Sequence, residues 1–291
     1  MQFSVVIPSY NKRNTLRECV ESVLNQSYSD FEILIVDDGS TDDSLEVARG
    51  INDARVRLIE KENGGVSSAR NLGIKMSKNP WIAFLDGDDV WDKNHLQTIV
   101  DLAKSEPLAM VFSTSFERFS SKESIKEKFL SFKRDFNHYV VEDLFESWLR
   151  RKGVICSSSA VVHKSCFAKV GMFNQNLVRG EDTDLWIRLF KNFTIARTDV
   201  VTALYRLDSV DGNASLRKNS VRRFEVFYFK PKWFKWSSES RYYFHVIWGH
   251  FKMFVARKEW KNLFLLCSKY HFGLIVILFE RFARIFQGHT T

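Results

Sequence analysis

The stretch AFLDGDDVWD, residues 83–92, places three carboxylates directly after a run of apolar residues; they are Asp86, Asp88 and Asp89. Carboxylates at the end of a buried strand are costly to desolvate unless a cation or a hydrogen-bonding ligand meets them. A magnesium ion that carries a diphosphate is such a ligand, because Mg²⁺ takes one or two carboxylates together with phosphate oxygens and waters. A solvated turn that caps the next helix is the alternative, since Asp also favours caps and turns.

Strand-like and helix-like segments alternate around this stretch. Continuous apolar runs, typical of strands buried on both faces, lie at residues 3–8, 31–38, 56–60 and 81–86. Apolar residues at helical spacing follow a capping-box pattern at Thr15 and Glu18 and recur before Ala48, over 67–77 and around 92–104. This alternation predicts an α/β fold built from crossover units on a parallel sheet.

Polar segments follow three of the predicted strands. They are Pro8–Tyr10, Asp37–Ser40 and Asp86–Asp89. In an open α/β sheet, ligands bind at the carboxyl ends of the strands, so these segments are the candidate binding site. The first strand is not followed by GxGxxG, which makes a dinucleotide-binding dehydrogenase a weak interpretation.

The composition of the 291 residues is that of a folded soluble protein, with 45% hydrophobic and 27% charged residues. The four cysteines have no CxxC spacing, so neither a zinc site nor a disulfide framework is expected, and a reducing compartment fits best. The N-terminus reads directly as a strand and predicts no signal peptide. The apolar run FGLIVILF at 272–279 is far shorter than the roughly twenty residues that a membrane-spanning helix needs.

Charge divides the chain into two parts. Residues 217–291 hold 15 Lys and Arg against 4 Asp and Glu, a net charge of +11, which leaves −3 for the first 216 residues of a chain with net charge +8. The same tail holds 20 of the 42 aromatic residues. We therefore expect a catalytic domain at 1–216, with a nucleotide-binding half at 1–105 and an acceptor half at 106–216. A basic aromatic helical extension is expected at 217–291.

Five motifs in the chain resemble those of the family 2 glycosyltransferases, in the order in which that family has them. They are VVIPSYN (5–11), EILIVDDGSTDDS (32–44), NGGVSSARNLGI (63–74), WIAFLDGDD (81–89) and RGEDTDLWIRL (179–189). The resemblance covers roughly residues 3–215. It implies the glycosyltransferase A fold, a nucleotide-binding, mixed and mainly parallel sheet flanked by helices. It also implies transfer of a sugar from a nucleotide-sugar donor.

The resemblance assigns nucleotide-binding roles to several residues. It places Asp38 on the uracil ring, and a carboxylate can accept from the N3–H that uracil has and cytosine lacks, which favours a UDP-sugar. Pro8 and Tyr10 match positions that line the nucleoside, although an aromatic at a strand end is as often simple packing. Arg70 matches a position near the phosphates, which a guanidinium can bind in bidentate fashion, with a surface arginine as the alternative. The pair Gly64-Gly65 is expected to form a turn close to the ligand.

The aspartates after residue 85 match the DxD element of the family. By that match Asp88 ligates Mg²⁺ or Mn²⁺, and Asp86 contacts the ribose or supports the metal. The ion would act as a Lewis acid on the departing nucleoside diphosphate. Asp89 is expected to cap the following helix.

The motif RGEDTDLWIRL predicts a helix with an acidic first turn. In the family, the aspartate of its Glu-Asp pair is the general base that takes the proton of the acceptor hydroxyl. Asp182 is therefore the candidate base and Glu181 the supporting acceptor contact, with Asp184 as the second choice. The alternative is an acidic first turn that only complements the helix dipole.

One departure from the family pattern stands near the end of the catalytic domain. Many relatives have a histidine shortly after a Tyr-Arg pair, whereas here Tyr205-Arg206 is followed by Leu207 and Asp208, and the next histidine is His245. Asp208 or Asp211 could take its place, or the dependence on metal could be weaker.

The tail has apolar positions at helical spacing in two segments: Phe244, Ile247, Trp248, Phe251, Phe254 and Val255, and Leu274, Ile275, Leu278, Phe282 and Ile285. Basic amphipathic helices with aromatic residues bind membrane interfaces and are attracted to anionic lipid. Peripheral membrane contact is therefore expected, with a helical subdomain that packs its aromatics as the alternative. No zinc-finger or recognition-helix signature accompanies the charge, so nucleic-acid binding is not expected.

The expected function is that of an inverting glycosyltransferase, a hexosyl- or N-acetylhexosaminyltransferase that uses a UDP-sugar and a glycan or lipid-linked acceptor. The expected product is a bacterial-type surface polysaccharide. The expected location is cytoplasmic, peripheral at the inner face of the membrane. Two rivals remain. A nucleotidyltransferase would need a glycine-rich basic loop after the first strand, which PSYNKRNT lacks. A non-catalytic membrane-associated scaffold would not need Asp38, Asp86, Asp88 and Asp182 together.

Overall fold

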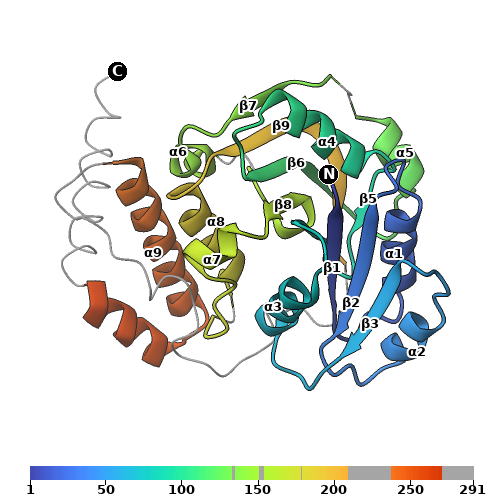
Figure 1. Cartoon of the computed structure of the whole chain (residues 1–291). Helices are drawn as coiled ribbons and strands as arrows, with labels where there is room; N and C mark the ends of the chain where they lie inside the picture. Colours follow the sequence, from blue (N-terminus) through green and yellow to red (C-terminus); the bar gives the residue numbers. More distant parts are fainter. Residues whose placement is uncertain (133–134, 151–153, 178, 209–236, 271–291) are drawn as a thin grey trace. The chain divides into compact units, whose positions relative to one another are not determined.

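The protein is described by a computed structural model, which covers residues 1–132, 135–150, 154–177, 179–208 and 237–270. Its contacts divide into two compact units. The first unit, Met1–Glu142, Gly153–Asn176 and Glu181–Arg217, contains one sheet of nine strands with helices on both faces (Figure 1).

The first half of this unit alternates strands and helices, as the sequence predicts. In chain order the elements are β1 (Phe3–Ser9), α1 (Leu16–Leu24), β2 (Phe31–Asp37), α2 (Ser44–Arg49), β3 (Val56–Glu60), α3 (Val66–Met76), β4 (Trp81–Phe84), β5 (Val90–Trp91) and α4 (His95–Ser105). The two-residue strand β5 is not predicted from the sequence, and β4 ends two residues earlier than expected. The turn Asp86–Asp89, closed by the Asp89 N–H on the Asp86 carbonyl, separates them.

The second half is less regular. It contains β6 (Val111–Phe119), α5 (Ile125–Leu130), β7 (His138–Val140), the 3₁₀ turn η1 (Ser157–Ser159), β8 (Ala160–His163), α7 (Cys166–Val170), α8 (Glu181–Phe190) and β9 (Ile195–Arg206). Strands β4 and β8 are antiparallel, as are β8 and β6, whereas β6 and β9 are parallel. The sheet is therefore mixed.

Strand β1 lies at the centre of the parallel part of the sheet. The strand order is β3-β2-β1-β4-β8-β6-β9-β5, with β7 paired to β9 beside this path, and β1 pairs in parallel with both β2 and β4. The chain builds outward from β1 to β3 and then returns to the other side of β1 with β4. Such a reversal of strand order creates the crevice in which α/β proteins bind ligands. The ends of β1 and β4 thus place Ser9 and Asp86 at the expected binding edge.

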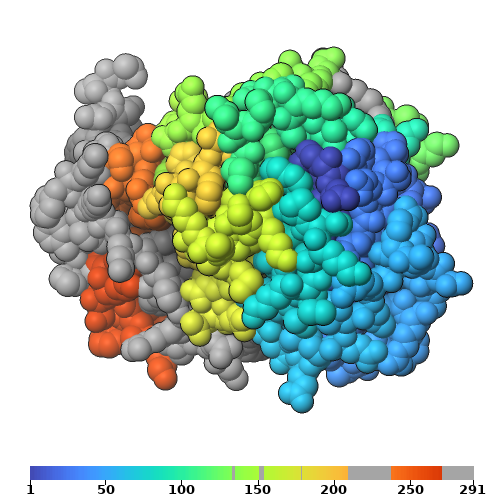
Figure 2. Space-filling model, in the orientation of Figure 1, coloured from blue at the N-terminus to red at the C-terminus, as the bar shows by residue number. Residues whose placement is uncertain are grey.

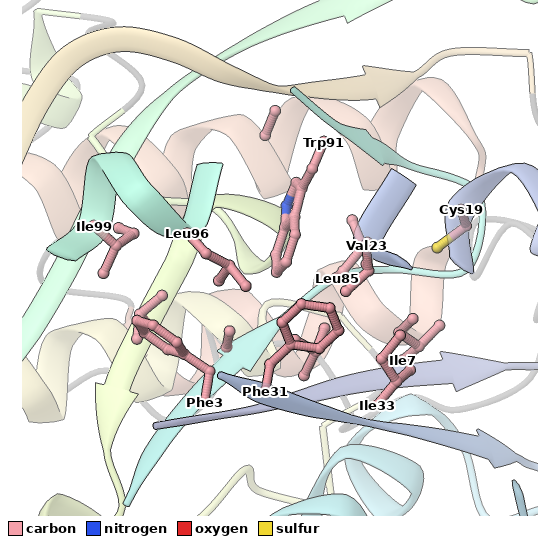
Figure 3. Packing of buried hydrophobic residues seen from close by; sticks show 14 of the residues in the cluster. Phe3, Ile7, Cys19, Val23, Phe31, Ile33, Leu85, Trp91, Leu96 and Ile99 are labelled. Carbon is pink, nitrogen blue, oxygen red and sulfur yellow. The ribbon is translucent and has the colours of Figure 1, made fainter. Parts of the chain in front are cut away.

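Alternate residues of β1 serve two buried faces, which explains its continuous apolar run. Phe3 and Ile7 point toward α1 and α4, where Cys19, Val23, Leu96 and Ile99 pack around them (Figure 3). On the other face Val6 packs against Gly73 of α3 so closely that a Cβ on Gly73 would lie 2.3 Å from Val6 Cγ1. Phe84 of β4 packs edge-on against Phe173 and Trp186.

The helix α3 lies beside the segment that leads to α8 (Figures 1 and 2). Two reciprocal hydrogen bonds join them: Asn71 Nδ2 donates to the Phe173 carbonyl at 2.8 Å, and the Phe173 N–H donates to Asn71 Oδ1 at 2.9 Å. This contact fixes the amino end of α8 near the parallel half of the sheet.

The second unit consists of Asp143–Lys152, Leu177–Gly180 and Lys218–Thr291. Its described helices are α6 (Leu144–Leu149), α9 (Ser238–Ala256) and a helix over residues 260–270. Phe145 of α6 packs on Tyr242 and Tyr243 of α9, with ring centroids 5.7 and 5.8 Å apart. The tail therefore shares its core with α6, a short helix from the middle of the chain. A domain boundary at residue 216 would place α6 in the acceptor half instead.

Burial in the second unit corrects one expectation for the tail. Of the six apolar positions of the first tail segment, Phe244, Ile247 and Phe254 are each at most 5% exposed and pack inside this unit, whereas Val255 is 41% exposed. This half of the stripe is therefore not available to a membrane surface. Among the described residues, no helix combines the length and apolar character that a membrane crossing requires. The predicted segment 274–285 and the run 272–279 lie outside the described residues.

Candidate functional site

The loop Asp86–Asp89 is held in place by residues at the start of α1. The Thr15 hydroxyl donates to the Gly87 carbonyl at 2.9 Å, and Cys19 Sγ lies 3.4 Å from the Asp86 carbonyl oxygen. Thr15 is the N-cap residue of α1, but its side chain makes no capping bond. The expected capping box is therefore wrong, because the hydroxyl is used to position the aspartate loop instead.

Asp89 is the anchor of this loop. It is completely buried, accepts from the Ser158 hydroxyl, and accepts at 2.9 Å from the backbone N–H of Arg206. Burial, followed by the charges of Asp88 and Asp86, raises the pKa of Asp89 well above its usual value. The expectation that Asp89 caps the next helix is wrong, since α4 begins after Asn94.

Arg206, the last residue of β9, also contacts this loop. Its Nε donates to the Asp88 carbonyl at 2.9 Å, and a terminal nitrogen pairs with Glu18 of α1. Asp208, proposed as a substitute for the missing histidine, instead accepts from Ser120 and Ser121. These bonds lower the pKa of Asp208, with the Ser121 hydroxyl as the largest cause. The other substitute, Asp211, lies outside the described residues.

Arg70 joins the two halves of the site. Its side chain is 4% exposed, with one terminal nitrogen 2.6 Å from Asp86 Oδ1 and the other 3.0 Å from Glu181 Oε1. The guanidinium also stacks on the ring of Phe173, 5.1 Å from its centroid. It is not the surface arginine of the alternative interpretation. A planar fork with two carboxylate partners is a rigid link, so Arg70 sets the distance between the loop Asp86–Asp89 and α8.

The first turn of α8 carries the acidic motif. Glu181 is half-buried on Arg70, and burial, followed by the charge of Asp182, raises the pKa of Glu181 to about 7 against the opposing charge of Arg70. Asp182 Oδ1 accepts from the Thr183 N–H at 2.6 Å. Asp184 is held by Arg188 at 2.7 Å, which leaves it a structural role.

Asp88 has a cation beside it. The ammonium of Lys12, in the loop after β1, lies 2.5 Å from Asp88 Oδ2, and the two side chains are 13% and 17% exposed. Lys12 is not predicted from the sequence, because one lysine in a polar loop carries no local signal.

Asp38 and the loop 61–65 are tightly linked. Asp38 is 2% exposed and accepts from the backbone N–H of Gly64 at 2.9 Å and of Gly65 at 2.7 Å. Lys61 Nζ lies 2.5 Å from Asp38 Oδ1. Gly65 has φ 87°, a conformation that favours glycine. The turn expected at Gly64-Gly65 is present, and its backbone is bonded to Asp38.

The remaining predicted residues lie at the same edge of the sheet. Pro8 is buried in β1 opposite Val36 of β2, and Tyr10 is half-buried just beyond the end of β1. Ser40 bonds to Asp37 through both its N–H and its hydroxyl and to the Asn11 N–H, so the loops after β1 and β2 meet.

The donor atoms can be tested against a divalent ion. Among the described residues, no three His, Cys, Asp or Glu side chains are arranged to hold a metal by themselves. Asp88 Oδ2 nevertheless contacts a cation already, the Lys12 ammonium. Because Mg²⁺ needs only one or two carboxylates when phosphate oxygens and waters complete its shell, the residues fit an ion that is shared with a bound diphosphate.

Comparisons with known proteins match this chain to one family. The family model described as glycosyl transferase family 2 matches residues 4–170. An uncharacterized glycosyltransferase of Rickettsia felis is 34% identical over 202 residues, which are 67% of this chain and 31% of that protein. The uncharacterized glycosyltransferase EpsJ of Bacillus subtilis is 39% identical over 41% of this chain and 35% of its own length. This chain thus spans about a third of the length of these two relatives.

The solved structure of S. aureus TarS 1-349 in complex with UDP-GlcNAc has a similar fold. It superposes with a TM-score of 0.62 at 20% identity, over 78% of this chain and 64% of that one. The same TarS fragment in complex with UDP gives a TM-score of 0.56 over 71% of this chain. The fold, the five ordered motifs and the family match agree, and the chain belongs to the family 2 glycosyltransferases.

Proposed function

We propose that the protein transfers a sugar from a UDP-sugar to a hydroxyl of a glycan or lipid-linked acceptor, with inversion at the anomeric carbon. The observation that carries this proposal is the Arg70 bridge, which joins the donor-side Asp86 to Glu181 beside Asp182. Relatives named chondroitin synthase and TarS in complex with UDP-GlcNAc support a nucleotide sugar as donor and a polysaccharide as product, and bacterial surface polysaccharide fits this class.

The nucleoside would bind at the ends of β1 and β2. Pro8 and Tyr10 would line the base and ribose, and Asp38 would accept from the uracil N3–H. The two glycine N–H groups that donate to Asp38 fix the direction of its carboxylate. Asp86, oriented by Arg70, would bind the ribose.

Asp182 would act as the general base. It lies in the first turn of α8, next to the residue that Arg70 ties to the donor loop. A carboxylate there can take the acceptor proton as the hydroxyl attacks the anomeric carbon from the side opposite to the leaving UDP. A single displacement of this kind inverts the configuration. Glu181, held by Arg70, would orient the acceptor.

A divalent ion, Mg²⁺ or Mn²⁺, fits Asp88 and would supply Lewis-acid stabilisation of the leaving diphosphate. Asp88 would hold it, while the bonds from Arg206 and Thr15 keep the loop that carries Asp88 in place. Asp86 would contribute charge beside it.

The test of the base is Asp182→Asn, with Asp184→Asn as its matched control on the same turn. Removal of the base should lower turnover by about 10²–10⁴-fold and leave UDP affinity nearly unchanged. Asp184→Asn loses only its pair with Arg188 and should keep turnover. Turnover is measured as UDP release across a panel of nucleotide sugars with acceptor.

Normal turnover in Asp182→Asn would refute the base assignment. Vesicle binding by a wild-type protein that neither binds UDP nor turns over any donor would favour the non-catalytic scaffold. Loss of turnover with chelator would support the metal.

A basic aromatic surface of the second unit supports peripheral attachment to the inner face of the cytoplasmic membrane. In the helix over residues 260–270, Trp260 is 62% and Phe264 is 72% exposed, one helical turn apart. Arg257, Lys258 and Lys261 are exposed beside them. Exposed aromatics flanked by basic residues match the chemistry of an anionic lipid surface. A lipid-linked acceptor would be held at the same surface.

The attachment is tested with vesicles of phosphatidylglycerol and of phosphatidylcholine. Trp260→Ser with Phe264→Ser should lower binding to the anionic vesicles about tenfold or more. Leu108→Ser, which changes a residue of the first unit that is 86% exposed, is the matched control and should bind as wild type does. Equal binding of all three proteins would refute this surface as the membrane contact.

A further inference from the structure

We propose that Lys61 determines which base the donor site accepts, by donating a hydrogen bond to the O4 carbonyl of uracil. This inference rests on the proposed function, because it adds a second contact to the base that Asp38 would bind through the N3–H. Its starting observation is the pair between Lys61 Nζ and Asp38 Oδ1, which lie 2.5 Å apart, with side chains that are 16% and 3% exposed.

The backbone of Lys61 is held against the end of β2. Lys61 is the first residue after β3, and its N–H donates to the Asp37 carbonyl at 3.0 Å. In the same loop, Asn63 Nδ2 donates to the Asp38 carbonyl at 2.8 Å. Gly39 lies so close to this loop that a Cβ there would be 2.9 Å from the backbone nitrogen of Asn63. The loop is therefore fixed, and it presents the ammonium of Lys61 beside Asp38.

Asp38 retains the capacity to accept from a base. A carboxylate has about four positions at which it can accept a hydrogen bond. In the described part of the chain, Oδ1 accepts from Lys61 and from the Gly64 N–H, whereas Oδ2 accepts from the Gly65 N–H alone. The second position on Oδ2 can take the N3–H of uracil, and none of the three donors has to leave.

Lys61 retains a donor in the same way. An ammonium has three N–H donors, and within the described residues two acceptors meet them, Asp38 Oδ1 and the Glu62 carbonyl. The third donor can bond to a ligand while the pair with Asp38 stays intact. A hydrogen bond from a charged donor is about twice as strong as one from a neutral donor, so this contact can contribute measurably to nucleotide affinity.

The order of the strands predicts which carbonyl of the base Lys61 meets. The sheet runs β4, β1, β2, β3, and Asp86 follows β4, Asp38 follows β2 and Lys61 follows β3. In uracil, O2 lies beside the ring nitrogen that carries the ribose, whereas O4 lies on the other side of N3. A nucleoside with its ribose at Asp86 and its N3–H at Asp38 therefore directs O4 toward β3, where Lys61 lies.

The two contacts together select uracil over cytosine. Uracil has an N3–H donor beside the O4 acceptor, which match the carboxylate of Asp38 and the ammonium of Lys61. Cytosine has an acceptor at N3 and an amino donor at position 4, so each atom would face a group of its own kind. A site whose buried polar groups lose their partners rejects such an analogue strongly. Thymine has the same edge as uracil, so this pair of residues does not discriminate against it.

The test uses UDP analogues in which sulfur, a weaker acceptor, replaces one carbonyl oxygen of the ring. Calorimetry measures the affinities of wild type and Lys61→Met for UDP, 4-thio-UDP and 2-thio-UDP. Wild type should bind 4-thio-UDP about tenfold more weakly than UDP. Lys61→Met should bind these two equally, and any difference between UDP and 2-thio-UDP should be the same in both proteins. An effect of sulfur on the N3–H bond to Asp38 is common to both proteins and cancels in this cycle.

Lys12→Met is the matched control, because it also removes a lysine that lies 2.5 Å from an aspartate, Asp88, but leaves Lys61 in place. It should keep the tenfold difference between UDP and 4-thio-UDP. The contact with O4 would be overturned by a difference that persists in Lys61→Met or disappears equally in Lys12→Met. Equal binding of UDP and 4-thio-UDP by wild type would also overturn it.

The same titrations separate this inference from the proposed function. Wild type that binds UDP and turns over a UDP-sugar would leave the proposed function standing under any of the results that overturn the contact. Wild type that neither binds UDP nor turns over a UDP-sugar would refute both.

Lys61→Gln covers the case in which Lys61→Met does not fold, because its amide can still donate to Asp38. A neutral donor makes a bond about half as strong as a charged one, so the difference between UDP and 4-thio-UDP should fall from about tenfold to about threefold. An unchanged difference in Lys61→Gln would overturn the role of Lys61.

Discussion

Arg70 shows how one buried side chain can organise a site. It is a guanidinium that is 4% exposed between Asp86 and Glu181, whose side chains are 27% and 13% exposed. Its charge offsets the cost of partly burying these two carboxylates. Its contacts with the loop Asp86–Asp89 and with α8 make it a positioning residue for both.

Arg70→Met should therefore destabilise the protein by about 3–5 kcal/mol, since both carboxylates lose their partner. The measurement is thermal or denaturant unfolding. Arg49→Met is the matched control, because Arg49 pairs with Glu60 on the surface, with side chains 56% and 50% exposed, and such pairs contribute little. Equal losses in the two variants would show that the Arg70 bridge is not buried as described.

Glu181 predicts a pH dependence of stability. Its pKa is raised from 4.5 to about 7 by burial first and by Asp182 second. The folded protein thus holds a proton that the unfolded chain releases, so this group adds stability below pH 4.5 that is lost as pH rises through 7. The loss is on the order of 3 kcal/mol.

Denaturant unfolding at pH 5 and pH 8 measures this loss. Glu181→Gln should flatten the difference between the two pH values, whereas Glu60→Gln, at an exposed pair, should keep it. If Glu181→Gln changes stability between pH 5 and pH 8 just as wild type does, the raised pKa of Glu181 is contradicted.

At the scale of elements, the contact of α3 with β1 fixes the position of Arg70. Helix α3 carries Arg70, and its Gly73 lies against Val6 of β1. Because a Cβ at residue 73 would meet Val6 Cγ1 at 2.3 Å, the helix could not keep its present distance from the sheet.

Gly73→Ala should cost about 1–3 kcal/mol through overpacking, and Val6→Ala in the same chain should recover part of it. Gly249→Ala is the control. Gly249 also lies in a helix, but a Cβ added there would have no described neighbour within 4 Å, so alanine should stabilise by roughly 0.5–1 kcal/mol. Unfolding in denaturant distinguishes the two; a stabilised Gly73→Ala would refute the close contact.

At the scale of the whole molecule, the second unit takes residues from three places in the chain. Phe145 is 4% exposed, Trp148 packs on Tyr242 with ring centroids 5.0 Å apart, and Arg241 pairs with Glu146. The middle helix α6 therefore depends on residues that come after the expected domain boundary at 216.

A chain that ends at residue 216 should expose the apolar face of α6. We expect it to melt at a lower temperature than the full chain and to bind more of the fluorescent dye ANS. Phe145→Ser with Trp148→Ser in the shortened chain should reduce the dye signal. A shortened chain with the stability and dye binding of the full chain would support 216 as a true boundary.

The alternation of elements, and the edge of the sheet where the site lies, could be predicted from local sequence patterns. The apolar runs predict β1 to β4 closely, and β3 matches at both ends, because strands buried on both faces leave a local signal. The polar segments after those strands predicted Asp38, Asp86 and Asp88 together at one edge, since parallel strands end on the same side. The five ordered motifs indicated the family.

The partners of those residues could be found only in the folded chain. Arg70 meets Glu181 across 111 positions of sequence, Lys12 meets Asp88 across 76, and Arg206 meets Asp88 across 118. No local pattern encodes such pairs, because the packing of α3, α8 and β9 on the sheet brings them together. Thr15 and Asp89 differ from their predicted roles for the same reason. Each could cap a helix locally, but in the folded chain each bonds to a group from a distant segment. A buried polar group must be hydrogen-bonded, so these partners decide the role.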